Sequence, residues 1–118
     1  MLFILSAKTM PTVPSESWAC YEIRRINKKE FKGIIEKYNF EFETGIGYES
    51  TRLFLQDIFN IRIDPVIERK KINVEEGDEI LVFTPKYKNG RHQKKEKVLS
   101  LEDLRKVKGN YYHVRRIK

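Results

Sequence analysis

The chain has 118 residues, a length that fits one domain, and its 40% hydrophobic and 12% aromatic residues are enough to bury a core. We therefore expect one globular domain over residues 1–118. Lys and Arg total 24 against 17 Asp and Glu, which gives a net charge of +7 and favours an anionic partner. A lysine-rich surface also serves solubility or heat stability, so charge alone does not decide the function.

The single cysteine, Cys20, excludes an internal disulfide framework. Beside it only His92 and His113 could act as soft metal ligands, so we expect neither a metal nor a cofactor. The apolar start, Met1–Leu5, is far shorter than a signal sequence or the roughly 20 residues of a spanning helix. These features predict a cytoplasmic protein without a membrane partner.

In chain order, Met1–Leu5 is expected to form an opening strand, and Pro11 and Pro14 interrupt the regular structure after it. Residues 19–26 alternate as a strand does. Asn27 with Glu30 then resembles a capping box, which predicts a helix over residues 27–38. The apolar face of that helix consists of Phe31, Ile34, Ile35 and Tyr38.

A second helix is expected over residues 50–60, ending before Asp64 and Pro65. Two strands, residues 66–74 and 79–84, flank a turn at which Gly77 can adopt a positive φ. The apolar run from Ile80 to Phe83 favours an interior strand. Residues 100–107 are expected to form a third helix that ends at Gly109 and Asn110, before a closing strand over residues 111–117. This order predicts an α/β domain with a mixed sheet of about five strands flanked by helices.

The glycine turn, Gly45 to Thr51, precedes the second helix. Unpaired N–H groups at a helix start attract anions, Gly45 and Gly47 allow close approach, and the Ser50 and Thr51 hydroxyls can bind phosphate. Ordinary helix capping explains the same residues. The turn is no Walker loop, because no GK[ST] motif occurs.

The basic loop, Pro85 to Lys97, carries six Lys and Arg residues against Glu96 alone. Such a loop can hold phosphates by charge and by bidentate arginine contacts. A solvated hairpin tip is the alternative. His92 lies within this loop and can titrate near neutrality, although an exposed histidine is usually a plain surface residue. His113 alternates with its neighbours on a strand and is interpreted as structural.

Several segments in order resemble the small viral anti-CRISPR ring nucleases, dimeric proteins of archaeal viruses and bacterial relatives that degrade cyclic tetra-adenylate of type III CRISPR systems. These segments are LFILSA, GIGYESTRLFLQDIF, ERKKINVEEGDEILVF and KVLSLEDL. The resemblance runs nearly end to end, with order and spacing matching better than identities. It implies a two-fold homodimer that holds a cyclic oligoadenylate across its axis.

The resemblance also implies metal-independent cleavage, in which a ribose 2′-hydroxyl attacks the adjacent phosphate and a histidine protonates the leaving 5′-oxygen. In this chain the position of that histidine is Tyr48. A phenol, with an ordinary pKa of about 10, shuttles protons at neutral pH much less well than imidazole. This departure places catalysis in question while leaving the binding turn in place.

Other positions carry over from the resemblance. Arg69 matches a phosphate-binding arginine, Ser6 matches the polar end of the first strand, and Glu49 matches the acidic residue after the histidine. The remaining expected ligand contacts are Lys8, Thr9, Lys86, Lys88 and Arg91, and Glu96 with Arg91 is the nearest match to a glutamate and arginine pair of the family.

Three functions remain open. The first is a ring nuclease in which Tyr48, His92 or a lysine of the basic loop donates the proton. The second is a protein on the same scaffold that sequesters or senses a cyclic oligonucleotide. The third is a basic viral protein that binds DNA, RNA or a protein partner directly, which we place behind the other two.

Overall fold

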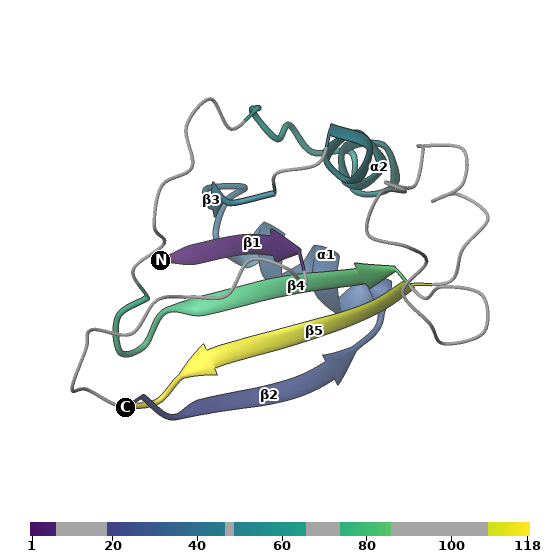
Figure 1. Ribbon diagram of the computed structural model, residues 1–118. Coiled ribbons are helices and arrows are strands. Elements are labelled where there is room, and N and C mark those ends of the chain that lie inside the picture. Colours follow the sequence, from purple (N-terminus) through teal and green to yellow (C-terminus); the bar gives the residue numbers. More distant parts are fainter. Residues whose placement is uncertain (7–18, 47–48, 66–73, 86–108) are drawn as a thin grey trace.

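The computed structural model describes residues 1–6, 19–46, 49–65, 74–85 and 109–118 (Figure 1). Within them, five strands form one sheet and two helices pack against it. The elements are β1 (Leu2–Ser6), β2 (Tyr21–Ile26), α1 (Lys28–Lys37), β3 (Glu43–Thr44), α2 (Glu49–Phe59), β4 (Glu79–Pro85) and β5 (Gly109–Arg116). No described helix is long and apolar enough to cross a membrane.

The sheet is mixed, with the strand order β2-β5-β4-β1-β3. Strands β3, β1 and β4 run parallel to one another, whereas β5 runs antiparallel to both β4 and β2. The predicted α/β domain with a mixed sheet of about five strands is confirmed. The apolar run from Ile80 to Phe83 lies in β4 between β1 and β5, which confirms its assignment to an interior strand.

Helix α1 forms where the capping box predicted it. The Asn27 side chain accepts a hydrogen bond from the Glu30 N–H at 2.8 Å, and the Glu30 carboxylate accepts one from the Asn27 N–H at 3.3 Å. These bonds satisfy two of the N–H groups that a helix start leaves unpaired. Phe31 and Ile35 are buried on the predicted face, with Ile34 and Tyr38 partly buried beside them.

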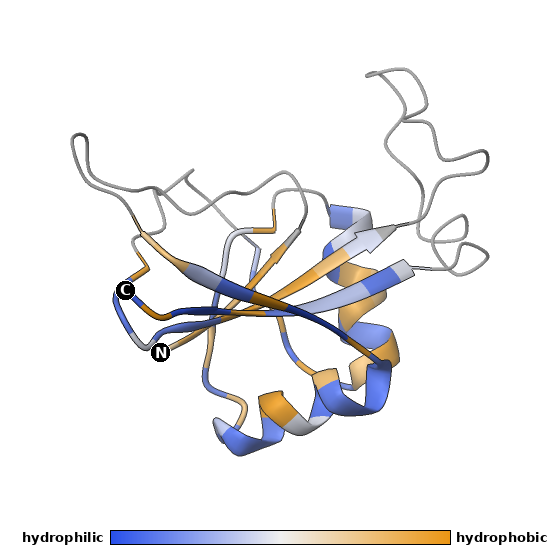
Figure 2. Cartoon of the chain, turned by 90° about the horizontal axis from the view of Figure 1, so that it is seen from below, coloured by the Kyte–Doolittle hydropathy of each residue, from blue (hydrophilic) through white to orange (hydrophobic). Residues whose placement is uncertain are grey.

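Helix α2 also lies within one residue of its predicted bounds. It buries Phe54, Leu55 and Phe59, and it ends where Asn60 adopts a left-handed conformation with φ of 51°. Figure 2 shows both helices on one side of the sheet, and their buried residues pack in one core with Leu81 and Phe83 of β4. Phe31 stacks on Phe59 with ring centroids 4.6 Å apart, so the two helices share one core.

The opposite face of the sheet has a smaller buried cluster. Phe3 and Leu5 of β1 pack there with Ile80 and with Val74, which precedes the turn into β4. In that turn Gly77 has a φ of 89°, as predicted. Apart from Val74, the predicted strand over residues 66–74 lies outside the described residues, and so does the predicted helix over residues 100–107.

The start of β5 corrects one prediction. Gly109 and Asn110 were expected to end a helix, but both lie in β5, paired with Pro85 and Thr84. A Cβ atom at Gly109 would overlap the buried ring of Phe83. Gly109 is therefore required because β5 packs against an aromatic ring. In the sequence, a glycine of this kind cannot be distinguished from one that ends a helix.

Candidate functional site

The glycine turn is anchored to β1. The Gly45 N–H and the Thr44 hydroxyl both donate hydrogen bonds to the Ile4 carbonyl, at 3.3 and 3.1 Å. The same hydroxyl accepts a hydrogen bond from the Ile46 N–H at 3.3 Å, and the Ile46 side chain is only 2% exposed. Hydrogen bonds thus hold the first residues after β3 beside Ile4, which lies two residues before the end of β1.

The first turn of α2 carries three of the predicted site residues. Glu49 is exposed and lies 3.5 Å from the Arg52 guanidinium, while Arg52 also donates to the Ile63 carbonyl at 3.0 Å. These contacts suit Glu49 to orienting the turn rather than reacting. Thr51 is buried, with 7% exposure. Ser50 Oγ is also buried and has no hydrogen-bond partner within the described part of the chain, so its hydroxyl does not serve as an ordinary cap.

The turn lies at the carboxyl edge of the sheet, the border formed by the ends of the three parallel strands. Because β3, β1 and β4 are parallel and adjacent, their last residues, Thr44, Ser6 and Pro85, face one edge of the sheet. The basic loop continues the chain directly from Pro85. Open α/β sheets bind ligands at the carboxyl ends of their parallel strands, so this edge is the candidate anion site.

The structure describes five of the predicted site residues: Ser6, by its backbone, at the end of β1, Gly45 beside Ile4, and Glu49, Ser50 and Thr51 in the first turn of α2. The other predicted site residues lie outside the described residues. They are Lys8, Thr9, Gly47, Tyr48, Arg69, Lys86, Lys88, Arg91, His92 and Glu96.

A second polar cluster lies on the face of the sheet that the helices cover, near the first residue of β4. The Glu79 carboxylate accepts a hydrogen bond from the Tyr38 hydroxyl, and its Oε1 lies 2.9 Å from His113 Nε2. His113 is 9% exposed. The structural interpretation of His113 from the strand pattern agrees with this contact. No sequence pattern indicates Glu79 and Tyr38 as the partners of His113, because the three residues are far apart in the chain.

The contacts of this cluster shift two pKa values. Burial alone would raise the pKa of the Glu79 carboxyl, but hydrogen bonds from Tyr38 and His113 outweigh it, and the pKa lies below its ordinary value. Burial, followed by the hydrogen bond to the Glu79 carboxylate, raises the pKa of Tyr38 to about 12. Both shifts keep Glu79 ionised and Tyr38 protonated at neutral pH, as a structural hydrogen-bond network requires.

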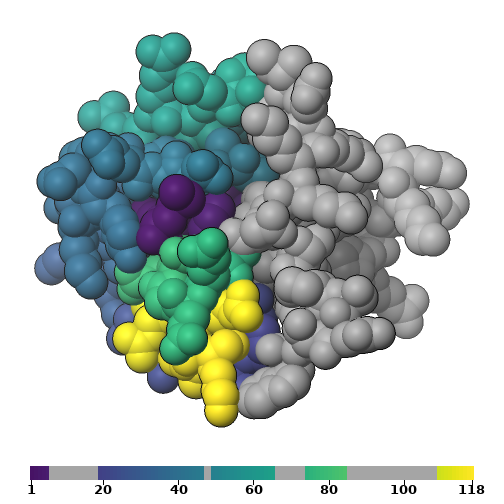
Figure 3. Space-filling model, turned by 90° about the vertical axis from the view of Figure 1, so that its left-hand side faces the viewer, coloured from purple at the N-terminus to yellow at the C-terminus, as the bar shows by residue number. Residues whose placement is uncertain are grey.

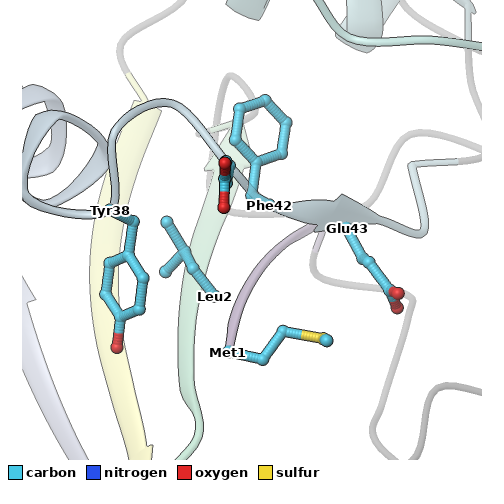
Figure 4. Close-up of a pocket in the computed structure, with 6 residues that line it drawn as sticks. Met1, Leu2, Tyr38, Phe42 and Glu43 are labelled. Atoms are coloured by element: carbon cyan, nitrogen blue, oxygen red, sulfur yellow. The ribbon is translucent and has the colours of Figure 1, made fainter.

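A pocket of about 320 Å³ opens beside Tyr38. Figure 4 shows its lining from the end of α1, the start of β1 and the segment that leads into β3. Figure 3 views the same end of the molecule, where the first residues lie between that segment and the start of β4. Glu41 and Glu43 place two carboxylates at the pocket, which disfavours an anionic ligand. The pocket is at the opposite end of β1 from the glycine turn and is not the predicted site.

Comparisons with known proteins agree on one kind of relative. A family model described as STIV B116-like matches residues 2–112. Among solved structures, the chain is similar to B116 of Sulfolobus turreted icosahedral virus, with 20% identity and a TM-score of 0.62 over 96% of this chain and 97% of that chain. At this identity the structural likeness shows a shared fold. No curated protein matches the chain.

Proposed function

We propose a function on one premise: the chain belongs to the STIV B116-like family, a family of archaeal-virus proteins. The chain acts as a ring-nuclease-like protein that binds a cyclic oligoadenylate at the carboxyl edge of its parallel strands. By removing this messenger it damps type III CRISPR signalling. Two copies hold the ring across a two-fold axis, so that each presents the same groups to half of the ligand.

One observation carries the proposal. The first residue of the glycine turn is hydrogen-bonded to β1 through Ile4, so the chain that leads toward α2 departs from β3 where the parallel strands end. Ser50 Oγ is buried there without a hydrogen-bond partner in the described residues, so it is an unsatisfied donor that a phosphate oxygen entering the turn would satisfy. The helix start adds a positive dipole end, and Lys86 and Lys88 follow Pro85, the last residue of β4, in the sequence.

In the chemistry proposed, a ribose 2′-oxygen forms a bond to the adjacent phosphorus while the bond from phosphorus to the 5′-oxygen breaks. The 2′-hydroxyl proton passes to water, the 5′-oxygen takes up one proton and leaves as a hydroxyl, and the other product end carries a 2′,3′-cyclic phosphate. Tyr48 precedes the first residue of α2 in the sequence, at the position where the related nucleases have histidine, and a phenol with an ordinary pKa of about 10 is protonated at neutral pH. A phenol is a poorly matched acid there, so we expect slow turnover.

Tyr48 equally favours a second function, sequestration of the ring without cleavage. Losing a matched general acid costs about 10² to 10⁴ in rate, whereas backbone N–H groups and hydroxyls that bind phosphate are unaffected. A sequestering protein would lower the free messenger in proportion to its own concentration. Binding is therefore common to both functions, and turnover separates them.

A chromatographic assay with EDTA present distinguishes these functions. Purified protein is incubated with cyclic tri-, tetra- and hexa-adenylate, and bound, free and cleaved nucleotide are quantified. Slow cleavage of one ring supports the nuclease, and retention without cleavage supports sequestration. If none of the rings is bound or cleaved, the proposal is wrong, and direct nucleic-acid or partner binding through the basic loop becomes the better explanation.

A further inference from the structure

The outer edge of β2 is unpaired within the described part of the chain. β2 is the last strand of the sheet, bonded to β5 alone, and its four central residues, Glu22 to Arg25, are all exposed. Ile23, in the middle of these four residues, is 67% exposed, so this edge presents an aliphatic side chain to solvent. An exposed edge strand pairs readily with another strand unless features such as charged side chains oppose it. Opposite charges that lie directly across a strand pair stabilise the pair instead.

The backbone groups at this edge can be identified from the neighbouring pair. The Ile117 N–H donates to the Cys20 carbonyl at 2.9 Å, and the Cys20 N–H donates to the Lys118 carbonyl at 3.0 Å, so Cys20 faces β5. Hydrogen-bonding direction alternates along an antiparallel strand. The continuous register of β2 with β5 therefore directs the N–H and carbonyl groups of Tyr21, Ile23 and Arg25 to the outer edge.

This alternation restricts how two copies of β2 could pair antiparallel about a two-fold axis. Residues whose N–H and carbonyl groups face outward must lie opposite each other in the two copies. The two-fold axis then passes through residue 22, 23 or 24 of the central part of β2. Centring on residue 22 places Glu22 opposite Glu22, and centring on residue 24 places Arg24 opposite Arg24. Both put like charges together, which destabilises a strand pair. Centring on Ile23 places Glu22 opposite Arg24 twice and Ile23 opposite itself.

We propose that β2 pairs with β2 of a second copy of this chain, centred on Ile23, to form a continuous sheet through both copies. Glu22 and Arg24 occupy non-hydrogen-bonded positions in this register, where side chains approach most closely. Each forms an ion pair with its counterpart on the partner. On the other face, the two Ile23 side chains cover each other. The strand thus supplies backbone bonds, charge complementarity and an apolar contact in one register.

This interface is separate from the proposed ligand site. β2 is at one edge of the sheet and β3, which leads into the glycine turn, is at the other (Figure 1). The pairing holds whether or not the chain binds a cyclic oligoadenylate. If the ligand-holding dimer also forms, the two interfaces together join dimers into a larger assembly.

Charge reversal tests the pairing. Glu22→Arg places arginines opposite arginines, Arg24→Glu places glutamates opposite glutamates, and each variant alone is expected to lose the association of the wild-type chain. Mixed one to one, the variants face each other with opposite charges at both positions. Sedimentation analysis at low salt is expected to show the wild-type mass restored in the mixture. Glu36→Arg, on the exposed face of α1, is the matched control and keeps the wild-type mass.

A disulfide tests the register. In a Cys20→Ser background, Ile23→Cys brings two sulfurs to the two-fold axis across a hydrogen-bonded pair with Cα atoms about 5.5 Å apart, within the range a disulfide spans. Mild oxidation is expected to convert most of the chain to a covalent dimer. Lys29→Cys, exposed on α1, is expected to remain largely monomeric under denaturing conditions.

The proposal is overturned if the wild type, both reversals and their mixture have the same mass while all remain folded. It is also overturned if Ile23→Cys cross-links no faster than Lys29→Cys. Circular dichroism and melting temperatures of each variant establish that a loss of mass is not a loss of folding.

Discussion

The Thr44 hydroxyl lies between two backbone groups, donating to the Ile4 carbonyl at 3.1 Å and accepting from the Ile46 N–H at 3.3 Å. It joins the end of β3, the strand β1 and the glycine turn through one oxygen atom. Because Ile46 is buried, its N–H has no access to solvent when this oxygen is removed.

Thr44→Val keeps the shape of the side chain but removes both hydrogen bonds. We expect it to lower the free energy of unfolding by about 1–2 kcal/mol, because the buried Ile46 N–H loses its acceptor. We also expect weaker binding of a cyclic oligoadenylate, since the turn loses its anchor. Thr44→Ser keeps the hydroxyl and is expected to change both quantities much less. Urea unfolding and a binding titration measure the two effects, and equal values for Val and Ser would contradict the role of the hydroxyl.

Tyr48→His tests the proposed proton donor. An imidazole at the start of α2, with a pKa near neutrality, is expected to raise metal-independent cleavage of the preferred ring by about a hundredfold or more. Tyr48→Phe removes only the hydroxyl. If Tyr48 is the acid, Tyr48→Phe loses turnover and retains binding.

Single-turnover assays of the three proteins with EDTA present provide the comparison. Tight binding by the wild type and by Tyr48→His, with no cleavage by either, would select sequestration over catalysis. Unchanged cleavage in Tyr48→Phe would exclude the phenol as donor and leave His92 or a lysine of the basic loop as the remaining candidates.

The Glu79 network predicts a pH dependence of stability. Its carboxyl pKa is lowered in the folded chain from an ordinary value of 4.5, so the carboxylate contributes stability that is fully present above that value. This contribution is lost as the pH falls through the lower folded pKa. Glu79→Gln is therefore expected to unfold more easily than the wild type at pH 7, with a difference that shrinks below about pH 4.

Melting temperatures of both proteins between pH 2 and pH 8 measure this dependence. Glu76→Gln, in the exposed turn before β4, is the matched control. A wild-type advantage over Glu79→Gln that stays constant across the whole range would show that the stabilisation does not depend on the ionised carboxylate.

Two glycines are expected to respond to alanine in opposite directions. A Cβ at Gly109 overlaps the ring of Phe83, so Gly109→Ala is expected to cost about 1–3 kcal/mol of unfolding free energy through overpacking. Gly33 lies in α1 with open space around its Cβ position, and Gly33→Ala is expected to stabilise the chain by about 0.5–1 kcal/mol. Denaturant titrations of the two variants measure both changes. A neutral Gly109→Ala would show that β5 does not pack on Phe83 as described.

The sequence predicted those elements in which apolar residues repeat with the period of a helix or a strand. The capping box at Asn27 and the spacing from Phe31 to Tyr38 locate α1 to within one residue, because capping and amphipathicity are local. Strand β3 was not predicted. It has only two residues, Glu43 and Thr44, and is a strand because it pairs with β1. A two-residue segment has no periodicity from which this pairing could be predicted.

Part of the candidate site could likewise be predicted from local sequence, and part depends on contacts between distant segments. The glycine turn could be recognised because glycines and hydroxyls before an apolar helical pattern indicate a helix start. Its anchoring to Ile4 depends on the parallel pairing of β1 and β3, which a single sequence does not reveal. The buried contact between Glu79 and His113 likewise depends on strands that meet in the folded sheet.

Native mass spectrometry of the chain mixed with cyclic tetra-adenylate tests whether the glycine turn holds the ring between two copies of the chain. For the wild type we expect a complex of two chains with one ring, intact or cleaved. Gly47→Val, which obstructs the approach of a phosphate to the turn, is expected to stay folded and lose that complex. A wild type that binds no ring, or a folded Gly47→Val that binds it equally well, would contradict a ligand site at the glycine turn.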